Sequence, residues 1–204
     1  MQRNDLFYVY KIVMTNNIKE QQDIPSNLIQ SCKRNERQAQ IRMYDLFAKK
    51  MFNTSMRIVK DSLLAEDIVQ ESFIAVFNSL ETYRGEVPFE VWLRRIVINR
   101  SIDQLRKQKF ILDELDESMQ TSYEEPDWDP ESSSETEVVN EVKKKINQLP
   151  DGYRIILSLH LIEGYDHDEI SQILKISAST SRSQLTRAKR KLIELLEIKR
   201  VSYD

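Results

Sequence analysis

Side chains that can contact nucleic acid gather in one segment near the end of the sequence. Residues 182–191 carry five basic side chains and no acidic one, and hydroxyl and amide side chains precede or interrupt this run. Such groups bond to base edges and to phosphates, so the segment is a candidate duplex-binding surface. A solvated helix face is the alternative interpretation. The candidate residues are Ser179, Thr180, Arg182, Ser183, Gln184, Arg187 and Lys191.

The elements around this segment have the order of a helix-turn-helix. Asp166 and Glu169 have the spacing of a capping box, which predicts a helix over residues 167–175. A short turn, residues 176–178, leads to a longer helix predicted over residues 179–198. The second helix of such a pair enters the major groove of DNA. Apolar residues at helical spacing are expected to hold the pair together: Ile170, Ile173, Leu174, Ile176, Leu185, Ala188 and Leu192.

Further helices are predicted before residue 110. Apolar residues recur at three- and four-residue steps over residues 27–51 and again over residues 65–80, which is helix periodicity. Pro88 suits the first position of another helix, whose residues 94–109 carry six basic side chains and one acidic side chain, Asp103. The side of the second helix that faces away from its apolar stripe holds four polar residues: Glu66, Asp67, Gln70 and Glu71.

The acidity of the chain is local. Residues 113–137 carry eleven acidic side chains and no basic one, so the rest of the chain has a net charge of +8 although the whole has -3. Such a segment buries little apolar surface and repels itself, which predicts a flexible linker over residues 110–136. We therefore predict an N-terminal extension over residues 1–24 and helical domains over residues 25–109 and 137–204.

The composition favours an all-α fold, with two small helical domains joined by a flexible acidic linker and a helix-turn-helix in the second. Three glycines and five prolines leave few residues for hairpin turns. Cys32, His160 and His167 do not have the spacing of a zinc site, and they are expected to be packed residues or, for His167, a helix start. No metal or other cofactor is predicted. The apolar residues 6–14 are too few to span a membrane, so a cytoplasmic protein without membrane insertion is expected.

Two separated stretches resemble the sigma factors of bacterial RNA polymerase, specifically the extracytoplasmic-function (ECF) group of the sigma-70 family. The first stretch, which resembles region 2 of that family, contains DIVQESF (67–73), FEVWLRRI (89–96) and NRSIDQLR (99–106). The second, which resembles region 4, contains LPDGYR (149–154), EGYDHDEI (163–170) and TSRSQLTRA (180–188). Together they cover roughly residues 25–108 and 137–197.

The resemblance implies a role for each module. The first would bind the clamp of core RNA polymerase through Glu66, Asp67, Gln70 and Glu71, and would open the minus-10 promoter element. The helix-turn-helix would read the minus-35 element as duplex. Because members of the family are commonly regulated by an anti-sigma factor, the resemblance also implies such a partner. Stacking and phosphate contacts suit capture of single-stranded DNA at minus-10. The residues implied there are Tyr83, Arg84, Trp92, Arg95, Asn99, Arg100, Asp103 and Arg106.

Some of these positions allow another interpretation. Trp92 lies on an apolar stripe and could be a core residue as well as a stacking surface. Asp103 could cap the helix or orient Arg106, and the acidic side chains at 66–71 could form a solvated face. Ser181 stands where many relatives have an apolar residue, and Gln184 where they often have a basic one, so details of minus-35 recognition stay open.

The resulting prediction is a transcription initiation factor with no enzymatic site of its own. The main alternative is a helix-turn-helix repressor or activator that acts without replacing a sigma factor. A helical adaptor that does not bind DNA is a third class, but it leaves the basic stripes without a purpose. An enzyme is the least favoured class, because the sequence has no convergent set of His, Cys and carboxylate side chains and no phosphate-binding loop.

Overall fold

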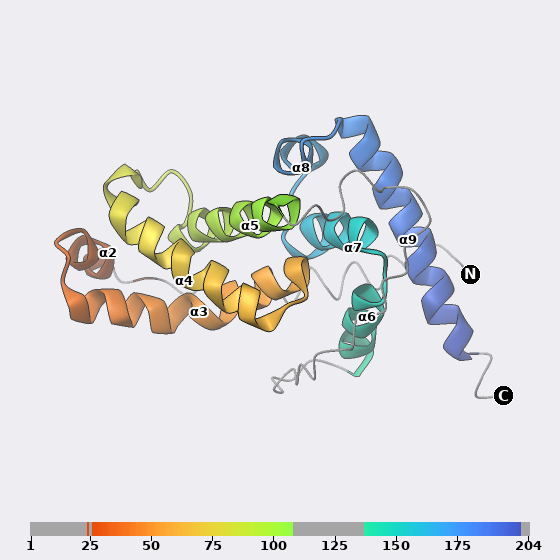
Figure 1. Cartoon of the computed structure of the whole chain (residues 1–204), viewed down its shortest axis with the longest axis horizontal. Helices are drawn as coiled ribbons and strands as arrows, with labels where there is room; N and C mark the ends of the chain where they lie inside the picture. The colour runs from red at the N-terminus through yellow and green to blue at the C-terminus, as the bar shows by residue number, and fades with distance from the viewer. Residues whose placement is uncertain (1–23, 25, 108–136, 201–204) are drawn as a thin grey trace. The chain divides into compact units, whose positions relative to one another are not determined.

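The computed structural model of the chain describes residue 24, residues 26–107 and residues 137–200. These residues form helices and no strand, which confirms the all-α prediction for this part of the chain (Figure 1). They belong to two compact units, one before residue 110 and one after it. Except for residue 24, the predicted N-terminal extension (1–24) and acidic linker (110–136) lie outside the described residues and stay predictions.

The first unit contains α2 (Ser26–Lys33), α3 (Arg37–Val59), α4 (Ser62–Ser79), a short 3-10 helix η1 (Leu80–Thr82) and α5 (Phe89–Lys107). Helices α3, α4 and α5 pack against one another in all three pairings, and α2 packs against α3. Their apolar stripes meet in one core, as the periodicity predicted. The buried side chains include Leu28, Cys32, Met43, Phe47, Met51, Ile68, Phe73, Val76, Leu93, Val97 and Ile102.

The prediction of one uninterrupted helix over residues 27–51 is wrong. The chain turns between α2 and α3 at Asn35, whose φ of 59° lies in the left-handed region that asparagine tolerates better than most residues. The turn is closed by a hydrogen bond of 3.0 Å from Asn35 N to Cys32 O. Apolar residues on both sides of the turn reach the same core, so their spacing alone did not indicate the break.

The helix predicted to start at Pro88 begins one residue later, at Phe89. The Pro88 carbonyl accepts from the amides of Val91 and Trp92, at 3.0 and 3.1 Å. Proline therefore occupies the position that precedes the helix, where its fixed φ and its missing N–H carry no penalty.

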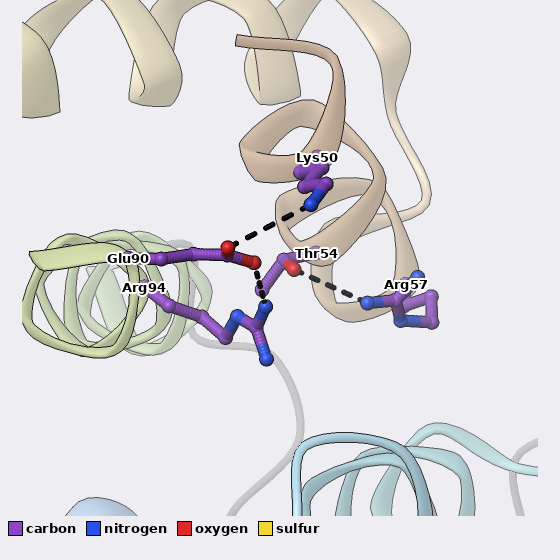
Figure 2. A network of polar contacts seen from close by, with 5 residues as sticks. All are labelled: Lys50, Thr54, Arg57, Glu90 and Arg94. Carbon is purple, nitrogen blue, oxygen red and sulfur yellow. Dashed lines mark hydrogen bonds and ion pairs between the residues drawn. The ribbon is translucent and has the colours of Figure 1, made fainter. Parts of the chain in front are cut away.

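Glu90, in the first turn of α5, is a buried carboxylate that joins two helices of the first unit. Its Oε2 lies 3.6 Å from Nζ of Lys50 on α3, and its Oε1 accepts a hydrogen bond from Arg94 one turn further along α5 (Figure 2). In the same network, Arg57 Nη2 donates to Thr54 Oγ1 at 3.1 Å. A buried charge needs such partners, so the network fixes the start of α5 against α3.

The second unit contains α6 (Glu137–Asn147), α7 (Asp151–Leu157), one turn of π-helix η2 (Ser158–Ile162), α8 (His167–Leu174) and α9 (Ala178–Arg200). The long helix α9 packs against α6, α7 and α8. The residues predicted to hold the helix-turn-helix together are buried, except Ile176, which is half-buried. Arg154 on α7 is also buried, and its guanidinium lies 2.6 Å from Asp151 Oδ1.

The predicted helix-turn-helix and its capping box are both present. Asp166 Oδ1 accepts from Glu169 N at 2.8 Å, and the Glu169 carboxylate accepts from Asp166 N at 3.0 Å. Helix α8 ends at Leu174, and the next residue, Lys175, lies in the left-handed region with φ of 56°. Ser177 Oγ then accepts from Thr180 N at 3.0 Å, which satisfies an amide in the first turn of α9.

Candidate nucleic-acid interfaces

Helix α9 presents most of the predicted duplex-binding residues to solvent. Ser179, Arg182, Ser183, Arg187 and Lys191 are exposed, and Thr180 is half-buried. Ser177 Oγ lies 2.7 Å from Ser179 Oγ and 2.8 Å from Thr180 Oγ1, so hydrogen bonds hold the hydroxyls at the start of the helix in place. This arrangement offers hydroxyl groups held by hydrogen bonds and, further along the helix, exposed basic side chains, which suits a DNA groove and its phosphates.

Gln184 does not lie on this exposed face, contrary to the prediction. It is 6% exposed and lies among the buried residues Ser181, Leu185 and Ala188. Residues 181, 184 and 188 are three or four positions apart, so they share one side of a helix, and here that side faces the core. Gln184 has polar sequence neighbours, but its spacing from Ser181 and Ala188 places it on the core side of the helix. Its Oε1 has no hydrogen-bond partner among the described residues.

The acidic face predicted on α4 is exposed at all four positions, Glu66, Asp67, Gln70 and Glu71. Sequence reasoning missed two apolar residues on the same side of the helix, Leu63 and Ile74, which are 75% and 61% exposed. Both are in helical phase with Asp67 and Gln70, so the spacing could have indicated them. Leu63 and Ile74 therefore add exposed apolar area to the acidic face.

One residue of the acidic face pairs with a residue predicted to contact minus-10 DNA. Arg100 Nη1 on α5 lies 3.2 Å from Glu71 Oε2 on α4. Both side chains are partly exposed, so solvent screening limits the strength of this pair. The structure therefore brings the edges of two predicted surfaces into contact.

The loop between η1 and α5 is held by Tyr83. The ring centroid of Tyr83 lies 5.6 Å from that of Phe89, with the rings edge to face, and 5.2 Å from that of Trp92. The Tyr83 hydroxyl donates a hydrogen bond to the Val87 carbonyl at 2.7 Å. Burial raises the pKa of the Tyr83 phenol above its usual value. Arg84 is exposed at the tip of this closed loop, beside Gly85 with φ of 79°. Tyr83 therefore shapes the loop, whereas Arg84 is accessible to a ligand.

Helix α5 continues this surface. Arg95, Asn99 and Asp103 are exposed at steps of four residues, so they form one stripe along the helix. Arg106 Nη1 lies 2.8 Å from Asp103 Oδ1, which agrees with the interpretation that Asp103 orients Arg106. Trp92 is half-buried against Tyr83 and Phe89, so it is neither a fully buried core residue nor a fully exposed ring.

No set of three or more metal-ligating side chains comes together within the described ranges. None of the helices in those ranges has the length and apolar character that crossing a bilayer requires.

Comparison with known proteins agrees with the two units. Sigma-70 region 2 matches residues 43–111, and sigma-70 region 4 matches residues 140–192. The chain is 30% identical over 172 residues to the ECF RNA polymerase sigma factor SigW of Bacillus subtilis, a match that covers 80% of this chain and 92% of SigW. It is 36% identical over 138 residues to the ECF RNA polymerase sigma-E factor of Haemophilus influenzae, covering 63% of this chain and 71% of that protein.

A solved structure shares the fold. The sigma factor RpoE of Bartonella quintana, crystallised with the anti-sigma factor NepR, superposes with a TM-score of 0.53 at 20% identity, over 77% of this chain and 96% of that one. The family matches to both units and the identity to SigW establish the family. The chain belongs to the ECF RNA polymerase sigma factors of the sigma-70 family.

Proposed function

We propose that this sigma factor binds core RNA polymerase through α4, directs it to promoters with two separate elements, and helps to open the minus-10 element. It acts in the cytosol and has no catalytic activity of its own. The observation that carries the proposal is the presence, in one chain, of an exposed acidic helix face and a capped helix-turn-helix with an exposed basic stripe.

Each surface has a partner of matching chemistry. The carboxylates of Glu66, Asp67 and Glu71 select a basic segment of the polymerase clamp, and Leu63 and Ile74 add apolar area at both ends of the contact. Area buried by such apolar anchors usually contributes more to affinity than exposed charge pairs do. The α4 face therefore supports docking on a protein, whereas α5 and α9 support docking on DNA.

Two DNA surfaces suit two states of the promoter. The α9 stripe offers hydroxyls and guanidinium groups to a major groove, as duplex recognition requires. The loop after η1 and the α5 stripe offer arginines beside aromatic rings, which suits unpaired bases and their backbone. We assign the minus-35 duplex to α9 and the minus-10 single strand to α5 and its loop.

An anti-sigma factor is a further proposed partner. The structurally similar RpoE of Bartonella quintana was crystallised with one, NepR. Such a partner would compete with the polymerase if it covered the α4 face of this chain.

Run-off transcription from a promoter library, with purified core RNA polymerase, tests the function. With the chain present, we expect initiation at sites that share a two-part motif, and without it none. Asp67→Lys should abolish this initiation, because it places a cation against the basic clamp, whereas Asp45→Lys, an exposed position on α3, is the matched control. DNA binding without initiation would instead favour the repressor or activator alternative.

A further inference from the structure

The two histidines of this chain lie face to face inside the helix-turn-helix unit. His160 belongs to η2 and His167 is the first residue of α8, and the sequence contains no other histidine. Their ring centroids are 5.0 Å apart, and the ring planes are inclined by only 14°. Two imidazolium rings stacked at this distance would repel each other, so the geometry disfavours a second positive charge in the pair.

Each ring has a hydrogen bond that fixes its orientation. His160 Nδ1 lies 3.0 Å from the Tyr165 carbonyl, which can only accept, so this nitrogen carries the hydrogen. His167 Nδ1 lies 2.9 Å from Ser181 Oγ on α9. The pair thus links η2, the start of α8 and the recognition helix.

Ser181 is the point where this link reaches the DNA-binding helix. Its side chain is completely buried. A directional hydrogen bond there selects one rotation and one axial position of α9, which an apolar contact does less strictly. Arg182 follows Ser181 directly and faces solvent, so any movement of α9 at Ser181 displaces a candidate DNA contact.

The charges around His167 oppose its protonation. His160 faces it from η2, and Arg182 and Lys189 face it from α9, whereas Asp166 is the one carboxylate in this set. Burial first, and then these positive neighbours, hold the pKa of His167 below its ordinary value, while Asp166 opposes the shift. Protonation would place a new cation between α8 and two cations of α9.

We propose that His167 is a positioning residue that holds α9 in the orientation that reads duplex DNA, and that it does so in its neutral form. Acidification therefore loosens the recognition helix and lowers discrimination between promoter sequences. The inference rests on the proposed binding of minus-35 duplex by α9. It adds to that function a dependence on pH, through the protonation of His167 at its contacts with His160 and Ser181.

The sign of the stability effect follows from the lowered pKa. The unfolded chain takes up the proton near the ordinary histidine pKa of about 6.5, before the folded chain does. The contribution of neutral His167 to stability is therefore complete above that pH and is lost as pH falls from there towards the folded pKa. NMR of the chain without a histidine tag should show the His167 imidazole titrating below the ordinary histidine pKa.

The decisive experiment compares holoenzymes that contain wild-type chain, His167→Asn or Ser181→Ala. Asparagine keeps a polar atom near the position of Nδ1 but does not titrate. The measured quantity is the ratio of affinities for a promoter fragment with an intact and with a scrambled minus-35 element, at about pH 8 and about pH 6, on either side of the ordinary histidine pKa.

For wild type we expect this ratio to fall roughly threefold to tenfold at the lower pH, the size of one hydrogen bond or like-charge contact. His167→Asn should match wild type at the higher pH and stay flat, which also corrects for any effect of pH on the polymerase. Ser181→Ala should have the lower ratio at both pH values, with helix content checked by circular dichroism.

The outcomes separate the two proposals. A wild-type ratio of one at the higher pH would refute the proposed minus-35 function itself. A wild-type ratio that is high but unaffected by pH, or an equal fall in His167→Asn, would leave that function intact and overturn the role of His167.

Discussion

The two units build their candidate surfaces in different ways. In the second unit, one helix carries the surface, and local caps at Asp166 and Ser177 determine where its elements begin. In the first unit, the surface is divided between α4, a loop and α5, and contacts between distant residues hold these parts together, such as Glu90 with Lys50. The comparison shows that local caps set where the elements of the second surface begin, whereas contacts between distant residues assemble the parts of the first.

The largest expected effect is at the tertiary contact of the first unit. Glu90→Ala removes the carboxylate shared by Lys50 and Arg94, and we expect the free energy of unfolding to fall by about 2 kcal/mol, below the value for a fully buried pair because both cations are partly exposed. Denaturant titration of Trp92 fluorescence measures it in a Trp128→Phe background, since the chain has two tryptophans.

A matched control for this variant is Glu81→Ala. Glu81 is 78% exposed and 4.0 Å from Lys33, so its removal should have almost no effect on unfolding. Equal losses for Glu81→Ala and Glu90→Ala would contradict the claim that the Glu90 network organises the first unit.

The second-largest expected effect is on DNA binding by the exposed stripe of α9 in the second unit. Arg187→Ala should weaken binding of the holoenzyme to minus-35 duplex by about 1–2 kcal/mol and make its dependence on salt less steep, because a cation on the exposed stripe is lost. Lys144→Ala, at an exposed position on α6, removes the same charge elsewhere in the unit. If both substitutions had the same effect on filter-binding curves, α9 would not be the contact surface.

Gln184 distinguishes packing from DNA contact in the second unit. Because its side chain is buried, a substitution there should change stability and leave DNA binding unchanged. Gln184→Met keeps the length of the side chain and removes a buried amide oxygen that lacks a partner among the described residues. We therefore expect the free energy of unfolding, measured by thermal denaturation, to rise by up to about 1 kcal/mol. Duplex affinity should not change. A clear loss of affinity without a loss of stability would show instead that Gln184 contacts DNA.

The smallest expected effect concerns the contact between two surfaces of the first unit. A double-mutant cycle with Glu71→Ala and Arg100→Ala should give a coupling energy below about 1 kcal/mol, because the pair is exposed to solvent. Each single substitution should act mainly on its own partner, the first on binding of core polymerase and the second on promoter opening. A large coupling in stability would mean that the pair is a structural element.

The sequence predicted features that short-range rules determine. The capping box at Asp166 and Glu169, the helix-turn-helix and the exposed acidic side chains of α4 depend on spacings of three or four residues, and all are present. The proposed binding roles of these surfaces are untested predictions.

Features that depend on tertiary contacts were not predicted. The turn at Asn35 interrupts an apolar pattern that continues on both sides, so periodicity could not locate it. Whether Gln184 faces solvent or the core depends on the rotation of α9, and the contact of His167 with Ser181 joins residues that no spacing rule relates. Pairings of this kind arise from packing, and sequence patterns constrain them only weakly.

The central claim is that both units act together on a two-part promoter held at a defined spacing. The most direct test inserts about five base pairs, half a turn of DNA, between the two elements of a promoter that this chain activates. Because the insertion rotates one element to the opposite side of the duplex, the account predicts loss of the run-off transcript, and restoring the original spacing should recover it. An undiminished transcript from the lengthened promoter would contradict the claim.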